Sequence, residues 1–367
     1  MPIHPWASLF LMRKVTLILL LLCGFSCNPK DPVSPDSKSC KIDSNLKFFT
    51  QNEMTQAFRN DIIEKLASSN QTNPEGALDR NKAAYFHVRF QLGISPLADY
   101  AVDAQNSTAL EMAVRAIEYS FKYQKPDGDF QLVIPVELIN TAAATEGDKI
   151  SGTAFFYSSL GSGLLALNDN AGFQAQLAAR KRIEILIPQY QLSLNFLKSR
   201  ADILKAIDGN APNRLFFDAL AFYSMGRYLN DDAAMNIGLD FAALALARKH
   251  PEGYFLEGNG WDSSYQGVAL AIGFRLLSIL KPAEPLRQTL YNGLACAAHW
   301  ETTRIKPTGE INSEGNSRVF AGGETFLGVE KQIAYSSVLI GLWNMYHYTG
   351  KEEYNNLANK VLAFYVP

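Results

Sequence analysis

The chain has 367 residues, of which 47% are hydrophobic and 19% are charged, and its formal net charge is -2. This apolar content is ample for a large buried core and excludes an intrinsically disordered protein. The near-neutral charge excludes the basic excess typical of nucleic-acid-binding proteins. Four scattered cysteines without a C-x-x-C pair exclude a disulfide scaffold and a structural zinc site.

The first 27 residues are interpreted as a signal peptide of the lipoprotein type. Arg13 and Lys14 precede the apolar run 15–22, which is too short to span a bilayer as a stable helix. The following sequence, GFSC, resembles the lipobox of bacterial lipoproteins, in which the cysteine is lipidated and becomes the first residue. This resemblance predicts lipidation of Cys27. A plain secretory signal is the alternative, and Met12 is an alternative start.

Residues 28–45 are predicted to be a flexible tether, because the run NPKDPVSPDSKS carries three prolines and almost nothing apolar. Residues 46–367 are then expected to form a single domain. With a lipid on Cys27, this domain is expected at the bacterial cell envelope, on the outer membrane or the periplasmic face. It would touch the membrane through the lipid anchor only.

Beyond residue 50, apolar residues recur at spacings of three and four, which predicts an all-α domain. The stretches 233–247 and 267–280 are apolar nearly all round, which is typical of helices packed on two sides. Weaker helices are expected between residues 51 and 100. The main helices are predicted at 106–124, 150–167, 181–207, 213–229, 231–249, 263–280, 284–303, 331–348 and 352–365.

Long and short connections alternate between these helices. The short ones lie at 168–170, 230–232, 281–283 and 349–351, and the long ones at 125–149, 208–212, 250–262 and 304–330. Consecutive antiparallel helices place alternate connections at opposite ends, so all long loops should meet on one rim. We therefore expect an α/α toroid, an incomplete or closed barrel of about six helical hairpins. An open α-solenoid is the rival, but no repeat of fixed length recurs.

The long loops carry most of the polar and aromatic residues that suit a binding site. A polar residue, a glycine and a turn recur in QKPDGDF (124–130), EGYF (252–255) and TGE (308–310), and an architectural role suits the glycines. The first of these also resembles the Q-x-x-D-G-x-F loops of carbohydrate-active α/α toroids, which makes Asp127 a candidate for substrate binding. Tyr157, in the helix after this loop, is expected to line the inner wall.

The densest constellation is EGNGWDSSYQG (257–267), where glycines, an aromatic ring and amides sit at the start of a helix. Aromatic rings stack on sugar rings, and amides and carboxylates bind their hydroxyls, so this segment favours a glycan site. Asp262 is equally suited to cap the helix. The substrate-binding candidates here are Asn259, Trp261, Asp262 and Gln266, with Tyr265 in the first helical turn.

Two further loops contribute. The run IDGNAPNR (207–214) opens another helix, where Asn213 is an N-cap candidate and Arg214 can bind a carboxylate through two hydrogen bonds. The last long loop, a candidate lid, supplies Glu314, Arg318 and Glu324 as substrate-binding candidates. The histidines are scattered, no metal motif occurs and no cofactor is expected.

The loop-to-helix motifs around Asn213 and Tyr265 resemble those of α/α-toroid polysaccharide lyases that act on uronate polymers such as alginate or glucuronan. The resemblance implies β-elimination, with Tyr265 exchanging protons and Asn213 and Arg214 holding the uronate carboxylate. The sequence departs from the alginate-lyase pattern, because Arg214 follows Asn213 in place of a histidine and Gly258 and Asn259 replace an arginine. The identity of the general base therefore stays open.

Two alternatives remain open beside the lyase. A glycoside hydrolase of the six-hairpin type would use two carboxylates, and a glycan-binding lipoprotein would need no acid or base. A polysaccharide or oligosaccharide is the expected partner in each case, with no nucleic acid. The candidate carboxylates for the hydrolase are Asp127, Asp129, Asp262, Glu314 and Glu324.

Overall fold

The computed structural model describes residues 67–83, 85–133, 145–326 and 329–366. The chain divides into two units, Met1–Ser37 and Lys38–Pro367, and every described residue belongs to the second. The signal peptide, Cys27, the tether at 28–45 and the first part, 51–66, of the stretch 51–100 in which weaker helices are expected lie outside the described residues.

Helices are the main secondary structure of the described part of the chain, which confirms the all-α class. Two 3-10 helices come first and a two-stranded antiparallel hairpin, β1 (Thr325–Phe326) with β2 (Val329–Glu330), precedes the last pair of helices. The helices are η1 (Asp79–Lys82), η2 (Val88–Gln91), α3 (Ile94–Asp103), α4 (Ser107–Phe121), α5 (Glu146–Asn168), α6 (Ala171–Gln174), α7 (Leu177–Glu184), α8 (Ile187–Lys198), α9 (Ala201–Asp208), α10 (Pro212–Leu229), α11 (Asp232–Ala247), α12 (Ser263–Ile279), α13 (Leu286–Thr302), α14 (Tyr335–Thr349) and α15 (Glu352–Tyr365).

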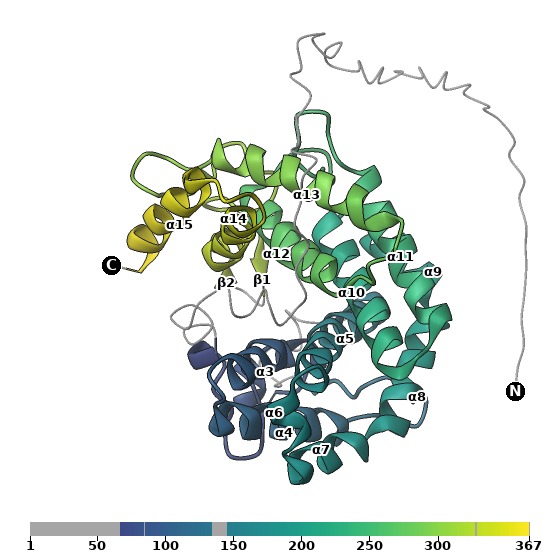
Figure 1. Ribbon diagram of the computed structural model, residues 1–367. Coiled ribbons are helices and arrows are strands. Elements are labelled where there is room, and N and C mark those ends of the chain that lie inside the picture. The colour runs from purple at the N-terminus through teal and green to yellow at the C-terminus, as the bar shows by residue number, and fades with distance from the viewer. Residues whose placement is uncertain (1–66, 84, 134–144, 327–328, 367) are drawn as a thin grey trace, which may run out of the picture. The chain divides into compact units, whose positions relative to one another are not determined.

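These helices form two layers. The inner helices α3, α5, α10, α12 and α14 pack one against the next in chain order. Helices α4, α11, α13 and α15 pack outside α3, α10, α12 and α14 (Figure 1). Helices α8 and α9 pack beside α5 and α10, and α7 packs beside α4. This alternation is the α/α toroid expected from the loop lengths. About six pairs were predicted, and the described residues supply five inner helices.

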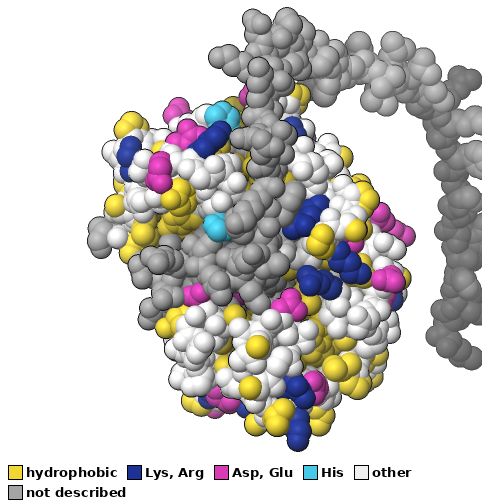
Figure 2. All heavy atoms as spheres, in the orientation of Figure 1, with side chains coloured by type: hydrophobic (Ala, Val, Ile, Leu, Met, Phe, Trp, Pro, Cys, Tyr) yellow, Lys and Arg dark blue, Asp and Glu magenta, His cyan; other side chains and the backbone are white. Residues whose placement is uncertain are grey.

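Burial separates the two layers. In α5, 18 of 23 residues are buried, and in α12, 13 of 17 are, which agrees with the two-sided packing predicted for 267–280. In α11 only 6 of 16 are buried, so the two-sided packing predicted for 233–247 is wrong, because α11 lies in the outer layer against α10. Helix α5 is long and apolar enough to cross a membrane by length and composition, but its most apolar stretch is fully buried inside the protein. It is therefore a core helix. On the face shown in Figure 2, acidic and basic side chains are scattered among hydrophobic and neutral ones where the side chains are coloured by type.

Several predicted helix boundaries are wrong. Helix α5 begins at Glu146 instead of 150, because the Thr145 hydroxyl caps it by accepting from the N–H of Asp148 (3.1 Å). The stretch 181–207 is not one helix but parts of α7, α8 and α9, and α8 starts around Pro188, whose missing N–H favours the first turn of a new helix. Helix α14 begins at Tyr335 instead of 331, because the backbone N–H of Lys331 continues the hairpin by donating to the Glu324 carbonyl (3.0 Å). Asn213 is not an N-cap, since α10 already begins at Pro212.

The recurring glycine motif is a repeated turn. After α4, α11 and α13 the chain reads KPDGDF, HPEGYF and KPTGEI, and the first residue of each turn donates its N–H to the carbonyl of the fifth (2.7, 2.7 and 2.8 Å). Gly128, Gly253 and Gly309 have φ of +90°, +110° and +93°. A Cβ on any of them would lie within 3 Å of a backbone carbonyl oxygen of another helix, in α8, α13 and α15 respectively. The glycines therefore let each turn dock against that helix, as the architectural interpretation proposed.

Candidate active site

The second, third and fourth long loops meet where α10 and α12 begin. The backbone N–H of Gly258 donates to the Asn210 carbonyl (2.9 Å), which joins the loop before α12 to the loop before α10. Ser317 donates its N–H to the Trp261 carbonyl (2.8 Å), which joins the last long loop to the same place. These three loops therefore share a rim, as the alternation of connections predicts.

Asp262 holds the last long loop on the start of α12. Its carboxylate caps α12 by accepting from the N–H of Tyr265 (3.0 Å) and also accepts from the N–H groups of Arg318 (2.9 Å) and Val319 (2.7 Å). The side chain is only 1% exposed. The capping role predicted for Asp262 is confirmed, and its oxygens are occupied within the protein.

Arg318 is the centre of the cluster that this loop builds. Its guanidinium binds Glu324 through two hydrogen bonds (3.0 and 2.8 Å) and also donates to Glu257. It lies over the ring of Tyr265, 4.3 Å from the centroid. The Tyr265 hydroxyl donates to Glu324 (2.8 Å), and Lys331 donates to both Tyr265 (2.5 Å) and Glu324 (2.8 Å). We call these five residues the Arg318 cluster.

The two glutamates of the cluster acquire opposite pKa shifts. Burial raises the pKa of Glu257 to about 7, and the contact with Arg318 offsets this only in part. For Glu324, burial also acts to raise the pKa, but hydrogen bonds from Arg318, Lys331 and Tyr265 outweigh it and hold the pKa at about 2. Near neutral pH the cluster thus contains one carboxyl that is protonated in a large fraction of molecules and one that is ionised.

A second group of charges lies beside this cluster at the start of α10. Arg214 donates to Asp208 (2.9 Å), whose side chain is fully buried. Arg89 lies over the Phe155 ring, 4.6 Å from its centroid. Burial and repulsion from Arg214 lower the pKa of Arg89 to about 10, with Tyr265 and Asp208 acting in the opposite direction. Arg214 is likewise repelled by Arg318, so the charges of both groups act on one region.

The structure brings together some of the residues predicted from sequence. Tyr265, Arg318 and Glu324 are in contact, and Arg214 is electrostatically coupled to Tyr265 and Arg318. Asn213 precedes Arg214 and is only 4% exposed, and its Oδ1 has no hydrogen-bond partner among the described residues. The rim therefore holds an amide oxygen, a tyrosine, two arginines and a carboxylate of the predicted set.

Other predicted residues lie inside the fold or away from the Arg318 cluster. Tyr157 is fully buried and donates to the Tyr190 carbonyl (3.0 Å), and the buried Gln266 amide bonds Phe255 and Ala297. These two face no substrate. Asp127 is exposed in the first repeated turn, near Lys125 (3.7 Å).

Three predicted residues lie in the neighbouring loops. Asn259 is exposed. Trp261 packs against Trp300 and Tyr254, and Glu314 is exposed on the last long loop.

Sequence reasoning missed three charged members of the site. Glu257 was within the densest motif, but only burial distinguishes it from an ordinary loop carboxylate. Lys331 was predicted to start a helix. The β1–β2 hairpin that turns it toward Tyr265 is too short to show the alternation of polar and apolar residues that identifies a strand. Arg89 lies in η2, where the apolar periodicity is weak. In the described part of the chain, no three His, Cys, Asp or Glu side chains are arranged to hold a metal ion.

No family model and no curated protein matches the chain. Similar solved structures include a mutant of UGL with dGlcA-Glc-Rha-Glc, at 12% identity and a TM-score of 0.48, covering 74% of this chain and 76% of that one. An unsaturated glucuronyl hydrolase mutant from Streptococcus agalactiae complexed with dGlcA-GalNAc6S has 12% identity and a TM-score of 0.38 (86% and 98% covered). A sugar epimerase from a ruminal bacterium has 12% identity and a TM-score of 0.31 (85% and 71%). At this level of likeness, the fold rests on the chain's own helix packing and the function on its own site.

Proposed function

We propose that this protein is a glycoside hydrolase that acts on a uronate-containing glycan. The observation that carries the proposal is the pair Glu257 and Glu324, which share the guanidinium of Arg318 and have opposite pKa shifts. Hydrolysis of a glycosidic bond needs one carboxylic acid that donates a proton and one carboxylate that stays ionised. Among the carboxyl groups considered from sequence, Glu324 belongs to this pair and Asp262 does not.

The roles follow from the two environments. Glu257 supplies the proton to the leaving oxygen, because burial keeps it protonated close to neutral pH. Glu324 supplies the negative charge that activates water or stabilises the developing positive charge on the sugar. The Tyr265 hydroxyl and Lys331 hold the Glu324 carboxylate in place.

The surrounding cations support a substrate that carries a carboxylate. Arg214 and Arg89 border the Arg318 cluster, and their charges repel each other. An anionic ligand would relieve that repulsion, and a guanidinium binds a planar carboxylate well through paired hydrogen bonds. A neutral glycan would gain nothing from this arrangement.

A lyase is the second candidate, and one observation favours it. The Tyr265 hydroxyl lies within hydrogen-bond distance of Lys331 and beneath Arg318, and such a tyrosine can exchange protons in β-elimination. Against it, burial and the bond to Glu324 raise the pKa of Tyr265, which disfavours its action as a base. A glycan-binding protein without catalysis is the third outcome to be tested.

A panel of uronate and neutral oligosaccharides separates the three. New reducing ends without the ultraviolet absorbance of a C4–C5 double bond indicate hydrolysis, and that absorbance indicates a lyase. Binding without cleavage identifies a glycan-binding protein and contradicts the proposal. We also propose that the protein reaches the cell envelope through a lipid on Cys27, on the basis of the signal sequence and the following GFSC motif.

A further inference from the structure

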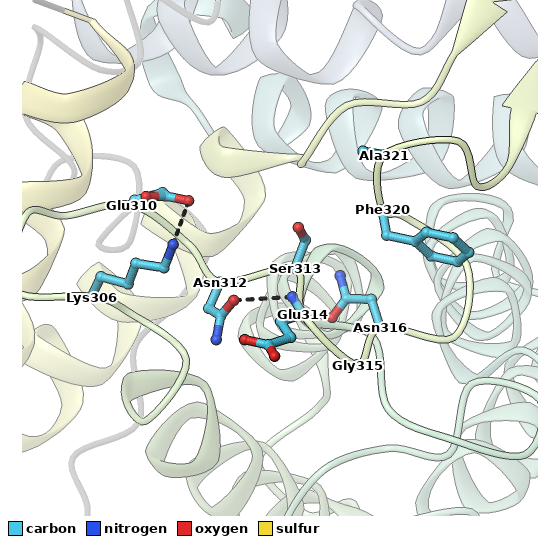
Figure 3. A pocket seen from close by; sticks show the side chains of 9 residues that line it. All are labelled: Lys306, Glu310, Asn312, Ser313, Glu314, Gly315, Asn316, Phe320 and Ala321. Atoms are coloured by element: carbon cyan, nitrogen blue, oxygen red, sulfur yellow. Dashed lines mark hydrogen bonds and ion pairs between the residues drawn. The ribbon is translucent and has the colours of Figure 1, made fainter.

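The last long loop folds into a pocket that the Arg318 cluster does not use. The pocket has a volume of about 580 Å³, within the range of small-molecule sites. Figure 3 shows Asn312, Ser313 and Glu314 on one side and the Phe320 ring on the other, with Asn316 between them. Its lining residues are Lys306, Glu310, Asn312, Ser313, Glu314, Gly315, Asn316, Phe320 and Ala321.

Several polar groups of this pocket have no partner among the described side chains. The carboxylate of Glu314, the Nδ2 of Asn312 and the hydroxyl of Ser313 make none of the side-chain hydrogen bonds found in the described residues, whereas Lys306 is paired with Glu310 (2.8 Å). Phe320, which lines the pocket, is 42% exposed. The pocket thus presents an apolar ring face opposite unpaired donors and acceptors.

The charges of the pocket offset one another, unlike those of the rim beside Arg89 and Arg214. Lys306 pairs with Glu310, and the Arg304 guanidinium lies beside Glu314, where it donates to the backbone carbonyls of Asn312 and Glu314. A carboxylate accepts strong hydrogen bonds from hydroxyl groups but repels another carboxylate. With its charges offset in this way, the pocket suits a sugar ring without an acid group.

The pocket is fixed relative to the Arg318 cluster. Asn316 accepts from both the N–H and the hydroxyl of Ser263 (3.0 Å each) and donates to the Val319 carbonyl (2.8 Å), while Asp262 holds the N–H of Arg318. Asn316 and Arg318 are two residues apart, so their Cα atoms lie at most about 7 Å apart. Neighbouring units of one oligosaccharide can span such a separation.

From these contacts we propose that the pocket between Glu314 and Phe320 binds an uncharged sugar unit of the glycan whose uronate lies at the neighbouring cations. The placement of the uronate at these cations rests on the proposed function. The substrate class is then a heteroglycan that joins a uronate to a neutral sugar. Phe320 stacks on the apolar face of the neutral ring, and Glu314, Ser313 and Asn312 bind its hydroxyls.

Calorimetric titration of the full chain with neutral tetrasaccharides of glucose, mannose or galactose tests the pocket without any catalysis. We expect one of these to bind, and Phe320→Ala and Glu314→Gln to weaken it about tenfold or more. Leu244→Ala, which truncates a side chain 40% exposed on α11, and Glu353→Gln on α15 are the matched controls and should bind as the wild type does. No binding by the wild type, or equal binding by both pocket variants, overturns the proposal.

Kinetics then separate failure of the pocket from failure of the proposed function. On a uronate joined to neutral sugars, both pocket variants should raise KM about tenfold with little change in kcat. On a uronate joined to a nitrophenol they should behave as the wild type does. If neither substrate is cleaved, the hydrolase proposal fails while the titration still decides the pocket. If both are cleaved and KM does not change, the pocket proposal fails alone.

Discussion

At the scale of single residues, one guanidinium gives two carboxyl groups different chemistry. Arg318 contacts both Glu257 and Glu324, but Glu257 is 3% exposed and has few other partners, whereas Glu324 also binds Lys331 and Tyr265. Desolvation therefore dominates at one carboxyl and hydrogen bonding at the other. This difference was not predictable from sequence, since it depends on burial and on contacts between residues 59 and 61 positions apart in the chain.

Glu257→Gln should remove the proton donor and lower turnover by about 10² to 10⁴. In the wild type, a pKa of about 7 means that the protonated fraction of Glu257 falls as the pH rises, so the rate should drop on the alkaline side of about pH 7. Rates on a cleaved uronate oligosaccharide across the pH range measure both effects. Glu353→Gln is the control. A wild-type rate that does not change between about pH 6 and pH 9 would contradict the assignment.

Tyr265→Phe distinguishes the two chemistries. In a hydrolase the hydroxyl only helps to hold Glu324, so we expect more than about a tenth of the wild-type turnover to remain. In a lyase the same change should cost about 10² to 10⁴ in rate. Unfolding in urea must accompany the assay, because the lost hydrogen bond to a charged group costs about 1.5–3 kcal/mol. A larger fall in rate with a normal stability would favour the lyase.

At the scale of elements, the alternation of long and short connections was the most informative feature of the sequence. It predicted that all four long loops share a rim, and hydrogen bonds join three of them, those around 208–212, 250–262 and 304–330. Of the first long loop, Asp127 belongs to a repeated turn docked against α8, and residues 134–144 lie outside the described residues. Helix boundaries were less predictable. The apolar spacing of the sequence continues across Pro188 and the β1–β2 hairpin, although the helices do not.

The repeated turns predict a clear effect on stability. Gly309→Ala combines a positive φ with a Cβ 2.1 Å from the Lys360 carbonyl oxygen, so it should destabilise the protein by about 3 kcal/mol or more. Gly350→Ala is the matched control, because its φ is also positive (+67°) but nothing lies within 4 Å of the added Cβ. It should cost about 1–2 kcal/mol. If urea unfolding gives the same loss of unfolding free energy for both variants, docking of the turn against α15 does not contribute to stability.

At the scale of the whole molecule, the site depends on segments distant in the chain. Arg89 comes from η2, Arg214 from α10, and Arg318 and Lys331 from the segment between α13 and α14. An ion pair from Arg275 on α12 to Asp99 on α3 (2.7 Å) also joins the early and late parts of the inner layer. Helix periodicity predicts the layers but not which charged loop residues come into contact. The sequence therefore predicted where the rim lies but not all of the residues that form the site.

The attachment of this domain to the envelope is predicted from the N-terminal signal and Cys27. Arg13, Lys14 and the apolar run 15–22 would direct export, and the cysteine after GFS would then receive lipid. One acyl chain gives only marginal membrane binding, so a stable anchor requires the several chains of a bacterial lipoprotein. We expect a palmitate analogue to label the wild type and not Cys27→Ala, with Cys23→Ala as the control that keeps its label. Labelling that survives the Cys27 change would contradict the anchor, and the plain secretory signal would then explain the N-terminus.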